Sequence, residues 1–202
     1  MTPRTALERG LRALALPLPH EATERLLEYV VLLEKWNRTY NLTAIRDPLE
    51  MVSHHLLDSL AVLAHLPMPS QGTLVDVGSG AGLPGIALAI ARPQWQVTLN
   101  DSNQKKAAFL RQAAIELQLA NVQVHEGRVE NWRPATRFDV VISRAFAEFA
   151  EFVSTCTHLV AAEGVLAAMT GAAPSAPDCR IIALQVPLLD AQRHLVLCKA
   201  PN

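Results

Sequence analysis

The chain has 202 residues, half of them hydrophobic, which is enough for one sizeable core and a small accessory element. The net charge of −1 excludes attraction of nucleic acid by a global basic field, so any such contact needs a local patch. Cys156, Cys179 and Cys198 are widely spaced, which argues against a disulfide framework or a zinc site and favours reduced thiols in the cytosol. Charged residues interrupt the apolar amino terminus, and no uncharged stretch of about eighteen apolar residues occurs, so we expect neither a signal peptide nor a membrane span.

The first 70 residues predict a helical extension. Apolar residues recur at helical spacing within residues 21–36, with charges between them. A second helix is expected over residues 47–65, because an aspartate, a proline and a glutamate at its start fit an N-cap, a first helical position and a capping box. Helix breakers in residues 67–72 indicate a linker. We therefore place a domain boundary at residue 70, with a second domain over residues 71–202.

A dense run of polar and aromatic residues, 36–43, joins these two helices, and two histidines and an aspartate follow it. His54 and Asp58 are four residues apart, so they can share one face of a helix. A metal site would need a third ligand, which we do not find in the sequence. We expect instead a buried hydrogen-bond cluster of Asn41, His55 and Asp58 that holds the helical extension on the rest of the protein.

From residue 73 the pattern changes to alternating strands and helices, which predicts a parallel sheet covered on both sides. The last two strands are too close in sequence for a helix to join them, so we expect them to pair as a hairpin. Residues 171–178, which contain two prolines, are expected to form a mobile loop. The expected strands cover residues 73–77, 96–100, 122–126, 138–143, 164–169, 181–186 and 193–199, and the expected helices cover 85–91, 103–119 and 146–160.

The most informative segment is 74–85, in which a short apolar run ends in glycines at alternate positions. Gly78, Gly80 and Gly82 can adopt positive φ and let the backbone approach a ligand without a Cβ in the way. A strand, a glycine turn and a helix form a nucleotide or nucleoside site at the carboxyl end of the first strand. Asp76 stands two residues before the first glycine and favours a cationic amino-acid group over a pyrophosphate. S-adenosylmethionine carries such a group, together with a sulfonium.

The same glycines allow a second interpretation, because residues 80–85 match the dinucleotide fingerprint G-x-G-x-x-G. That match begins two residues late relative to the strand end and carries Pro84 where the helix should begin. The preceding acid would also repel a pyrophosphate. We therefore favour S-adenosylmethionine, and keep as alternatives a dinucleotide-dependent oxidoreductase and a non-catalytic module that binds S-adenosylmethionine.

Polar residues follow three further strands. Asp101, at the end of the second strand, is placed to accept hydrogen bonds from ribose hydroxyls, to cap the next helix, or to do both. The loop 128–130 follows the third strand and either borders an adenine pocket or is an ordinary surface loop. Arg144, after the fourth strand, either binds a phosphate or a cofactor carboxylate, or begins a helix in solvent.

Eight short stretches of the chain together indicate a known family. They are Trp36-Asn37, Asn41-Leu42-Thr43, 55–59, 76–85, Asp101-Ser102, Phe109-Leu110, 128–130 and 143–146. With them, over nearly its whole length, the chain resembles the bacterial glucose-inhibited division protein B family, whose members methylate guanine N7 in small-subunit (16S) ribosomal RNA. The Leu-Pro-Gly end of the glycine loop and the Ser-Arg-Ala motif are the most specific of these features. Two departures occur, since Thr170-Gly171 stands where the family usually has Lys-Gly, and residues 171–180 form a shorter segment than usual.

The resemblance implies an α/β, Rossmann-like class I methyltransferase fold. We expect a mostly parallel seven-stranded sheet with a C-terminal hairpin and an N-terminal helical extension. It further implies S-adenosyl-L-methionine as cofactor, a cytoplasmic monomer without metal, and 16S ribosomal RNA as substrate, free or within a small ribosomal subunit or its precursor. Guanine N7 is unprotonated and nucleophilic at neutral pH, so catalysis needs positioning rather than a strong base.

Three sets of residues are expected to form the site. Arg144 and Phe146 are the candidates for positioning the reacting groups. The expected cofactor contacts are Gly78, Gly80, Leu83, Asp101, Val129, Glu130 and Arg144. The expected RNA contacts are Arg38, Arg46, His54, Lys105 and Lys106.

Overall fold

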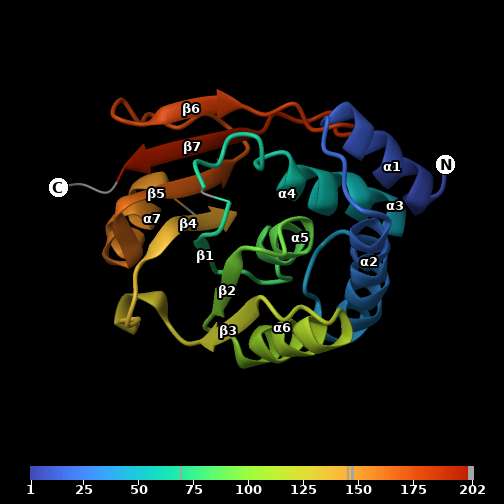
Figure 1. Cartoon of the computed structure of the whole chain (residues 1–202), viewed down its shortest axis with the longest axis horizontal. Helices are drawn as coiled ribbons and strands as arrows, with labels where there is room; N and C mark the ends of the chain where they lie inside the picture. Colours follow the sequence, from blue (N-terminus) through green and yellow to red (C-terminus); the bar gives the residue numbers. More distant parts are fainter. Residues whose placement is uncertain (69, 145, 147, 200–202) are drawn as a thin grey trace.

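The computed structural model describes residues 1–68, 70–144, 146 and 148–199, and a seven-stranded sheet lies at its centre (Figure 1). The strand order is β3-β2-β1-β4-β5-β7-β6. β1 to β5 are parallel, and β7 runs antiparallel to both β5 and β6. The predicted α/β fold with its C-terminal hairpin is confirmed. The strands are β1 (Thr73–Val77), β2 (Gln96–Asp101), β3 (Val122–Glu126), β4 (Phe138–Arg144), β5 (Val160–Thr170), β6 (Arg180–Ala183) and β7 (His194–Lys199).

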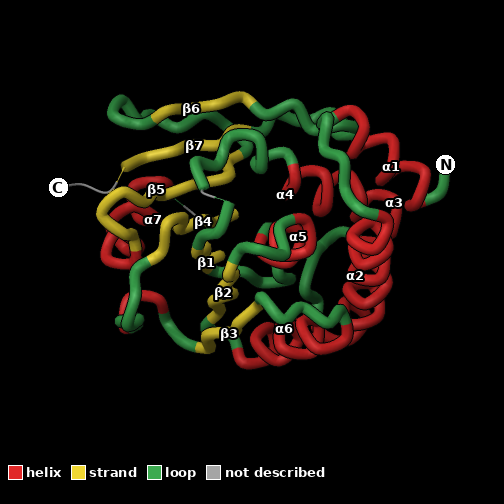
Figure 2. Tube along the Cα trace, viewed as in Figure 1, coloured by secondary structure: helices red, strands yellow, loops and turns green. Residues whose placement is uncertain are grey.

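Helices cover the two faces of the sheet unequally (Figure 2). Successive strand residues point to opposite faces, so Leu74 belongs to a large core and Val75 to a smaller one. The small core is closed by α7 (Phe149–Cys156), followed by the 3-10 turn η3 (Thr157–Leu159). The large core is covered by α1 (Pro3–Ala13), α2 (His20–Tyr40), α3 (Pro48–Met51), α4 (Asp58–Leu60), α5 (Gly85–Ala91) and α6 (Gln104–Glu116).

The predicted helical extension packs directly on the sheet and shares its large core. Tyr29 of α2 is completely buried and donates its hydroxyl to the carbonyl of Ala81, at 2.6 Å. Burial raises the pKa of Tyr29, which keeps this hydroxyl protonated as a donor. The extension therefore supports the glycine loop, and the domain boundary near residue 70 stays a prediction.

The second predicted helix begins as expected but changes to a π-helix after its first turn. The carboxylate of Asp47 accepts the N–H of Leu49 at 2.9 Å, with Pro48 at the first helical position. After α3 the chain forms a π-helix, η1 (Val52–Leu57), before α4. The apolar spacing in the sequence did not predict this wider turn, which frees backbone groups for other partners.

Other element ends differ from the prediction where pairing with a distant strand sets them. β5 begins at Val160, within the predicted helix 146–160, because this residue pairs with Phe138 of β4. β6 ends at Ala183 instead of residue 186. Residues 171–179 contain neither helix nor strand, and their mobility stays a prediction. Within the described ranges, no helix is both long and apolar enough to cross a membrane.

The expectation of three reduced thiols is wrong for two of them. Cys179 and Cys198 form a disulfide, whereas Cys156 is free and buried. The reason is the hairpin register, in which Arg180 pairs with Leu197, so that the residues just outside this pair face each other. A separation of 19 residues gave no sign of this contact in the sequence.

Candidate active site

The glycine loop at the end of β1 has the predicted geometry. Gly78, Gly80 and Gly82 have φ values of 69°, 58° and 88°. A Cβ on Gly78 would meet no atom within 4 Å, because that position faces open space. At Gly78 the loop thus presents bare backbone to its surroundings, as a ligand-binding turn requires.

Asp76 of β1 bonds two residues of this loop. Its Oδ2 accepts the hydroxyl of Ser79 at 2.7 Å and the N–H of Gly85 at 2.8 Å. Burial raises the pKa of Asp76 to about 6, against the opposing effect of these two hydrogen bonds. Its Oδ1 is buried without a hydrogen-bond partner among the described residues. Asp76 therefore fixes the shape of the loop, and its attraction for a cationic ligand stays a prediction.

A first cavity of about 240 Å³ opens at the carboxyl ends of β1, β2 and β3. Asp101 lines it and joins it to the glycine loop, because its Oδ2 accepts the N–H of Gly80 at 2.9 Å. The alternative role of Asp101 as the cap of α6 is wrong, since the side chain of Asn103 accepts the first N–H groups of that helix. Asp101 instead bonds the N–H of Asn103, at 2.8 Å.

The loop after β3 forms the opposite wall of the first cavity. Val129 and Glu130 line it, at the start of the 3-10 turn η2 (Val129–Asn131). Buried Asn100 sets the position of this loop by donating to the carbonyl of Gly127 at 2.9 Å. Of the expected cofactor contacts, Gly78, Asp101, Val129 and Glu130 line the first cavity.

A second cavity of about 690 Å³ lies beyond the end of β4. Phe146 lines both cavities, and the centroid of its ring lies 5.4 Å from that of Phe152 in α7. The lining of the second cavity comes from η1, α4, the ends of β4 and β5, the loop after β5 and the residue just before β7. The polar lining residues include His54, His55, Asp58, Arg144, Glu148, Thr170 and Arg193.

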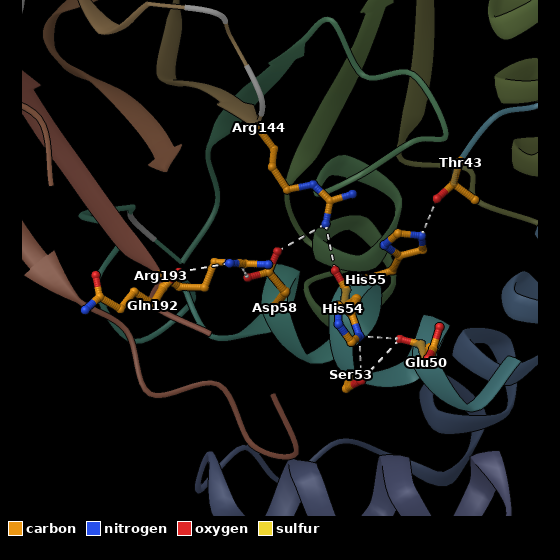
Figure 3. Close-up of polar contacts among 9 residues, drawn as sticks. All are labelled: Thr43, Glu50, Ser53, His54, His55, Asp58, Arg144, Gln192 and Arg193. Carbon is orange, nitrogen blue, oxygen red and sulfur yellow. Dashed lines mark hydrogen bonds and ion pairs between the residues drawn. The ribbon is translucent and has the colours of Figure 1, made fainter. Parts of the chain in front are cut away.

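The side chain of Arg144 points toward the π-helix η1 and the start of α4 (Figure 3). Its Nη1 donates to Oδ2 of Asp58 and to the carbonyl of His54, each at 3.1 Å. The other oxygen of Asp58 accepts Nε of Arg193, also at 3.1 Å. The interpretation of Arg144 as a solvated arginine at a helix start is therefore wrong. Arg144 lines the second cavity, which shares Phe146 with the first cavity.

The prediction of one buried cluster is wrong, because His55 bonds Thr43 whereas Asp58 bonds Arg144 and Arg193. Asn41 is exposed and ends α2 in a left-handed conformation, so its expected place in the cluster is wrong. Buried Asn37 takes that place, and its Oδ1 accepts the N–H of Thr43 at 2.9 Å. The hydroxyl of Thr43 bonds Nε2 of His55, also at 2.9 Å. Burial and the charge of Arg144 lower the pKa of His55 to about 4, so this ring is neutral near pH 7.

The expected RNA contacts are spread over several elements. His54 lines the second cavity, and the two lysines lie at the start of α6. Arg38 lies in the last turn of α2, and Arg46 lies just before α3. The side chain of Lys106 is half-buried and reaches the glycine loop, with Nζ 4.0 Å from the position of a Cβ on Gly80. Arg38, Arg46 and Lys105 are exposed.

Two functional candidates were absent from the sequence prediction. Arg193 is 135 residues from Asp58, and Tyr29 is 52 residues from its partner in the glycine loop. No local pattern marks either of them. In the part of the chain that the structure describes, no three histidine, cysteine or acidic side chains gather as a metal ion would require.

The glycine loop, the acid at the end of β2 and the antiparallel β7 between two other strands define the fold of the Rossmann-like, S-adenosylmethionine-dependent methyltransferases. A solved structure with this fold is the methyltransferase CalO1 of calicheamicin biosynthesis in its SAH-bound form, with a TM-score of 0.58 and 15% identity. The match covers 76% of this chain and 56% of that one.

Sequence comparison gives a narrower assignment. The family model described as rRNA small subunit methyltransferase G matches residues 22–177. A relative with that name in Methylobacillus flagellatus is 56% identical, over 96% of this chain and 97% of its own length. One in Burkholderia thailandensis is 50% identical, over 96% and 90%. The chain belongs to this family, and the predicted resemblance is confirmed.

Proposed function

We propose that this protein transfers the methyl group of S-adenosyl-L-methionine to N7 of a guanine in 16S ribosomal RNA. The observation that carries the proposal is the junction of two cavities at Phe146. The first has glycine-loop and strand-end walls suited to a nucleoside, and the second has two arginines suited to an anionic substrate. A group transferred between two ligands needs such a junction.

The residues of the first cavity fit the cofactor. Open space over Gly78 admits a ligand against bare backbone, and Asp101 keeps lone pairs that can accept ribose hydroxyls. Val129 and Glu130 would border the adenine. When bound, S-adenosylmethionine supplies an electrophilic methyl group. Among the other expected contacts, Leu83 is buried behind the loop and supports it, and Arg144 faces the substrate side.

This chain contributes chiefly position. Guanine N7 already carries the attacking lone pair, so no side chain has to remove a proton. Phe146 is the candidate for stacking on the guanine, as aromatic residues do with unstacked bases, and Phe152 supports its ring. Alignment of two bound reactants of this kind lowers a barrier by about 7–11 kcal/mol.

The exposed cations are proposed to hold the RNA outside the cavities. Arg38, Arg46 and Lys105 lie at the surface and can contact phosphates, while Lys106 lies closer to the cofactor. We further propose that the enzyme acts in the cytoplasm as a monomer. Its substrate is the RNA alone, or the RNA in a small ribosomal subunit or its precursor.

The deciding experiment is methyl transfer from labelled S-adenosylmethionine to purified small subunits and to naked 16S RNA, followed by identification of the methylated base. We expect 7-methylguanine in the 16S RNA. Binding of the cofactor with no transfer to either substrate would favour the non-catalytic module. Calorimetry with a nicotinamide dinucleotide in place of S-adenosylmethionine tests the oxidoreductase alternative, for which only the dinucleotide should bind.

A further inference from the structure

One carboxylate holds two arginines that come from distant parts of the chain. Asp58 is 2% exposed, and each of its oxygens accepts one hydrogen bond, from Arg144 of β4 and from Arg193 just before β7 (Figure 3). Because both bonds end on the same rigid group, Asp58 fixes the distance between the two guanidinium groups and their relative orientation.

The arginines keep donors for a further partner. Arg144 uses Nη1 for Asp58 and for the carbonyl of His54, and Arg193 uses Nε for Asp58 and Nη1 for the carbonyl of Gln192. A guanidinium carries five N–H groups, so each retains donors that are not used in these bonds. Both side chains also remain accessible, at 22% and 25%, on the wall of the second cavity.

The charge of this group suits a phosphodiester. Two guanidinium groups and one carboxylate leave a net charge of +1, and a phosphodiester carries one negative charge. Glu148 also lines the cavity, but it is exposed, so water screens its charge. Arginine forks bind phosphate through paired hydrogen bonds, which lysine cannot reproduce.

We propose that Asp58 is a positioning residue, which holds Arg144 and Arg193 as one clamp for a phosphodiester of the substrate RNA beside the target guanine. This inference rests on the proposed function. A clamp that is already formed binds its phosphate without first ordering two long side chains. Asp58 itself does not touch the RNA.

The test compares single and double variants in methyl transfer to small subunits. Asp58→Asn and Arg193→Gln should each raise KM for RNA about tenfold or more, the effect of one lost charge-assisted hydrogen bond, with kcat and the cofactor Kd changed less than about twofold. The double variant should be little worse than either single variant, because the residues act as a unit. Asp58→Glu should restore part of the affinity.

Three controls keep the outcome decisive. Glu24→Gln removes one partner of an ion pair with Arg4 on the surface of α1 and α2, and should change nothing. If Asp58→Asn melts below the assay temperature, Arg193→Lys provides the test, since it keeps the charge and should still raise KM for RNA. The salt dependence of RNA binding should also weaken in Arg193→Gln, which a purely structural role would not cause.

Several results would overturn the clamp. They are an unchanged KM for RNA in both single variants, independent losses that multiply in the double variant, or a loss confined to the cofactor Kd, which would assign the arginines to the cofactor carboxylate. These results are distinct from failure of the proposed function, in which the wild-type protein itself would methylate neither substrate.

Discussion

Replacing Gly78 by alanine tests whether the glycine loop binds the cofactor. Its φ of 69° is left-handed, and an L-residue there costs about 1–2 kcal/mol. The added methyl group would meet no atom within 4 Å, so the fold has no other cost to bear. For a chain of this size, the melting temperature should fall by roughly 2–8 °C, and the protein should stay folded at 25 °C.

The substitution should cost more free energy of cofactor binding than free energy of folding. The new methyl group would stand in the open space where the ligand has to contact the backbone. Inserting a methyl group into a close-packed contact costs about 1–3 kcal/mol. At 1.4 kcal/mol per factor of ten, this corresponds to roughly 5- to 140-fold weaker binding of S-adenosylmethionine.

Calorimetry of wild type and Gly78→Ala with S-adenosylmethionine measures this change. Asn41→Ala is the matched control, because Asn41 is also left-handed, with φ 49°, and lies exposed at the end of α2. It should lower the melting temperature and leave the cofactor Kd unchanged. A Gly78→Ala protein that binds within twofold of wild type would refute the assignment of this loop to the cofactor.

Three further predictions concern the site and its surroundings. Asp101→Ala should weaken cofactor binding by roughly 1–3 kcal/mol in calorimetry, whereas lower thermal stability with an unchanged Kd would limit Asp101 to bracing the loop. The depressed pKa of His55, about 4 against 6.5 unfolded, should cost wild type about 1.4 kcal/mol of stability per pH unit as pH falls from 6.5 towards 4. The pKa of Asp76 is raised to about 6, so its protonation stabilises the fold as pH falls, and it does so equally in wild type and in His55→Gln. The difference between the stabilities of these two proteins, measured by denaturation between pH 7.5 and 5, therefore isolates the effect of the histidine. Parallel pH dependences of the two stabilities would contradict a depressed pKa of His55. Lys105→Ala combined with Lys106→Ala should reduce the magnitude of the salt slope for RNA binding by up to about 1.4, and an unchanged slope would exclude the start of α6 as a phosphate contact.

Local signals in the sequence predicted the glycine-loop side of the candidate site. The bounds of β1 and α5 agree with the predicted ranges 73–77 and 85–91, because apolar runs and glycines set both ends. The arginine side of the candidate site depends on distant contacts. Arg144 and Arg193 are 86 and 135 residues from Asp58. The order of the strands and the packing of α4 on the sheet bring the three residues together.

The same long-range packing bears on the one cation that this chain lacks. Thr170 replaces the lysine that the resemblance led us to expect after the fifth strand, and it lies on the wall of the second cavity. Its hydroxyl is buried without a hydrogen-bond partner among the described residues, and its side chain adds no charge to this wall. Arg193 lines the same cavity beside Arg144. The cavity therefore keeps two permanent positive charges without a lysine at position 170, and these are the charges on which the proposed phosphate clamp depends.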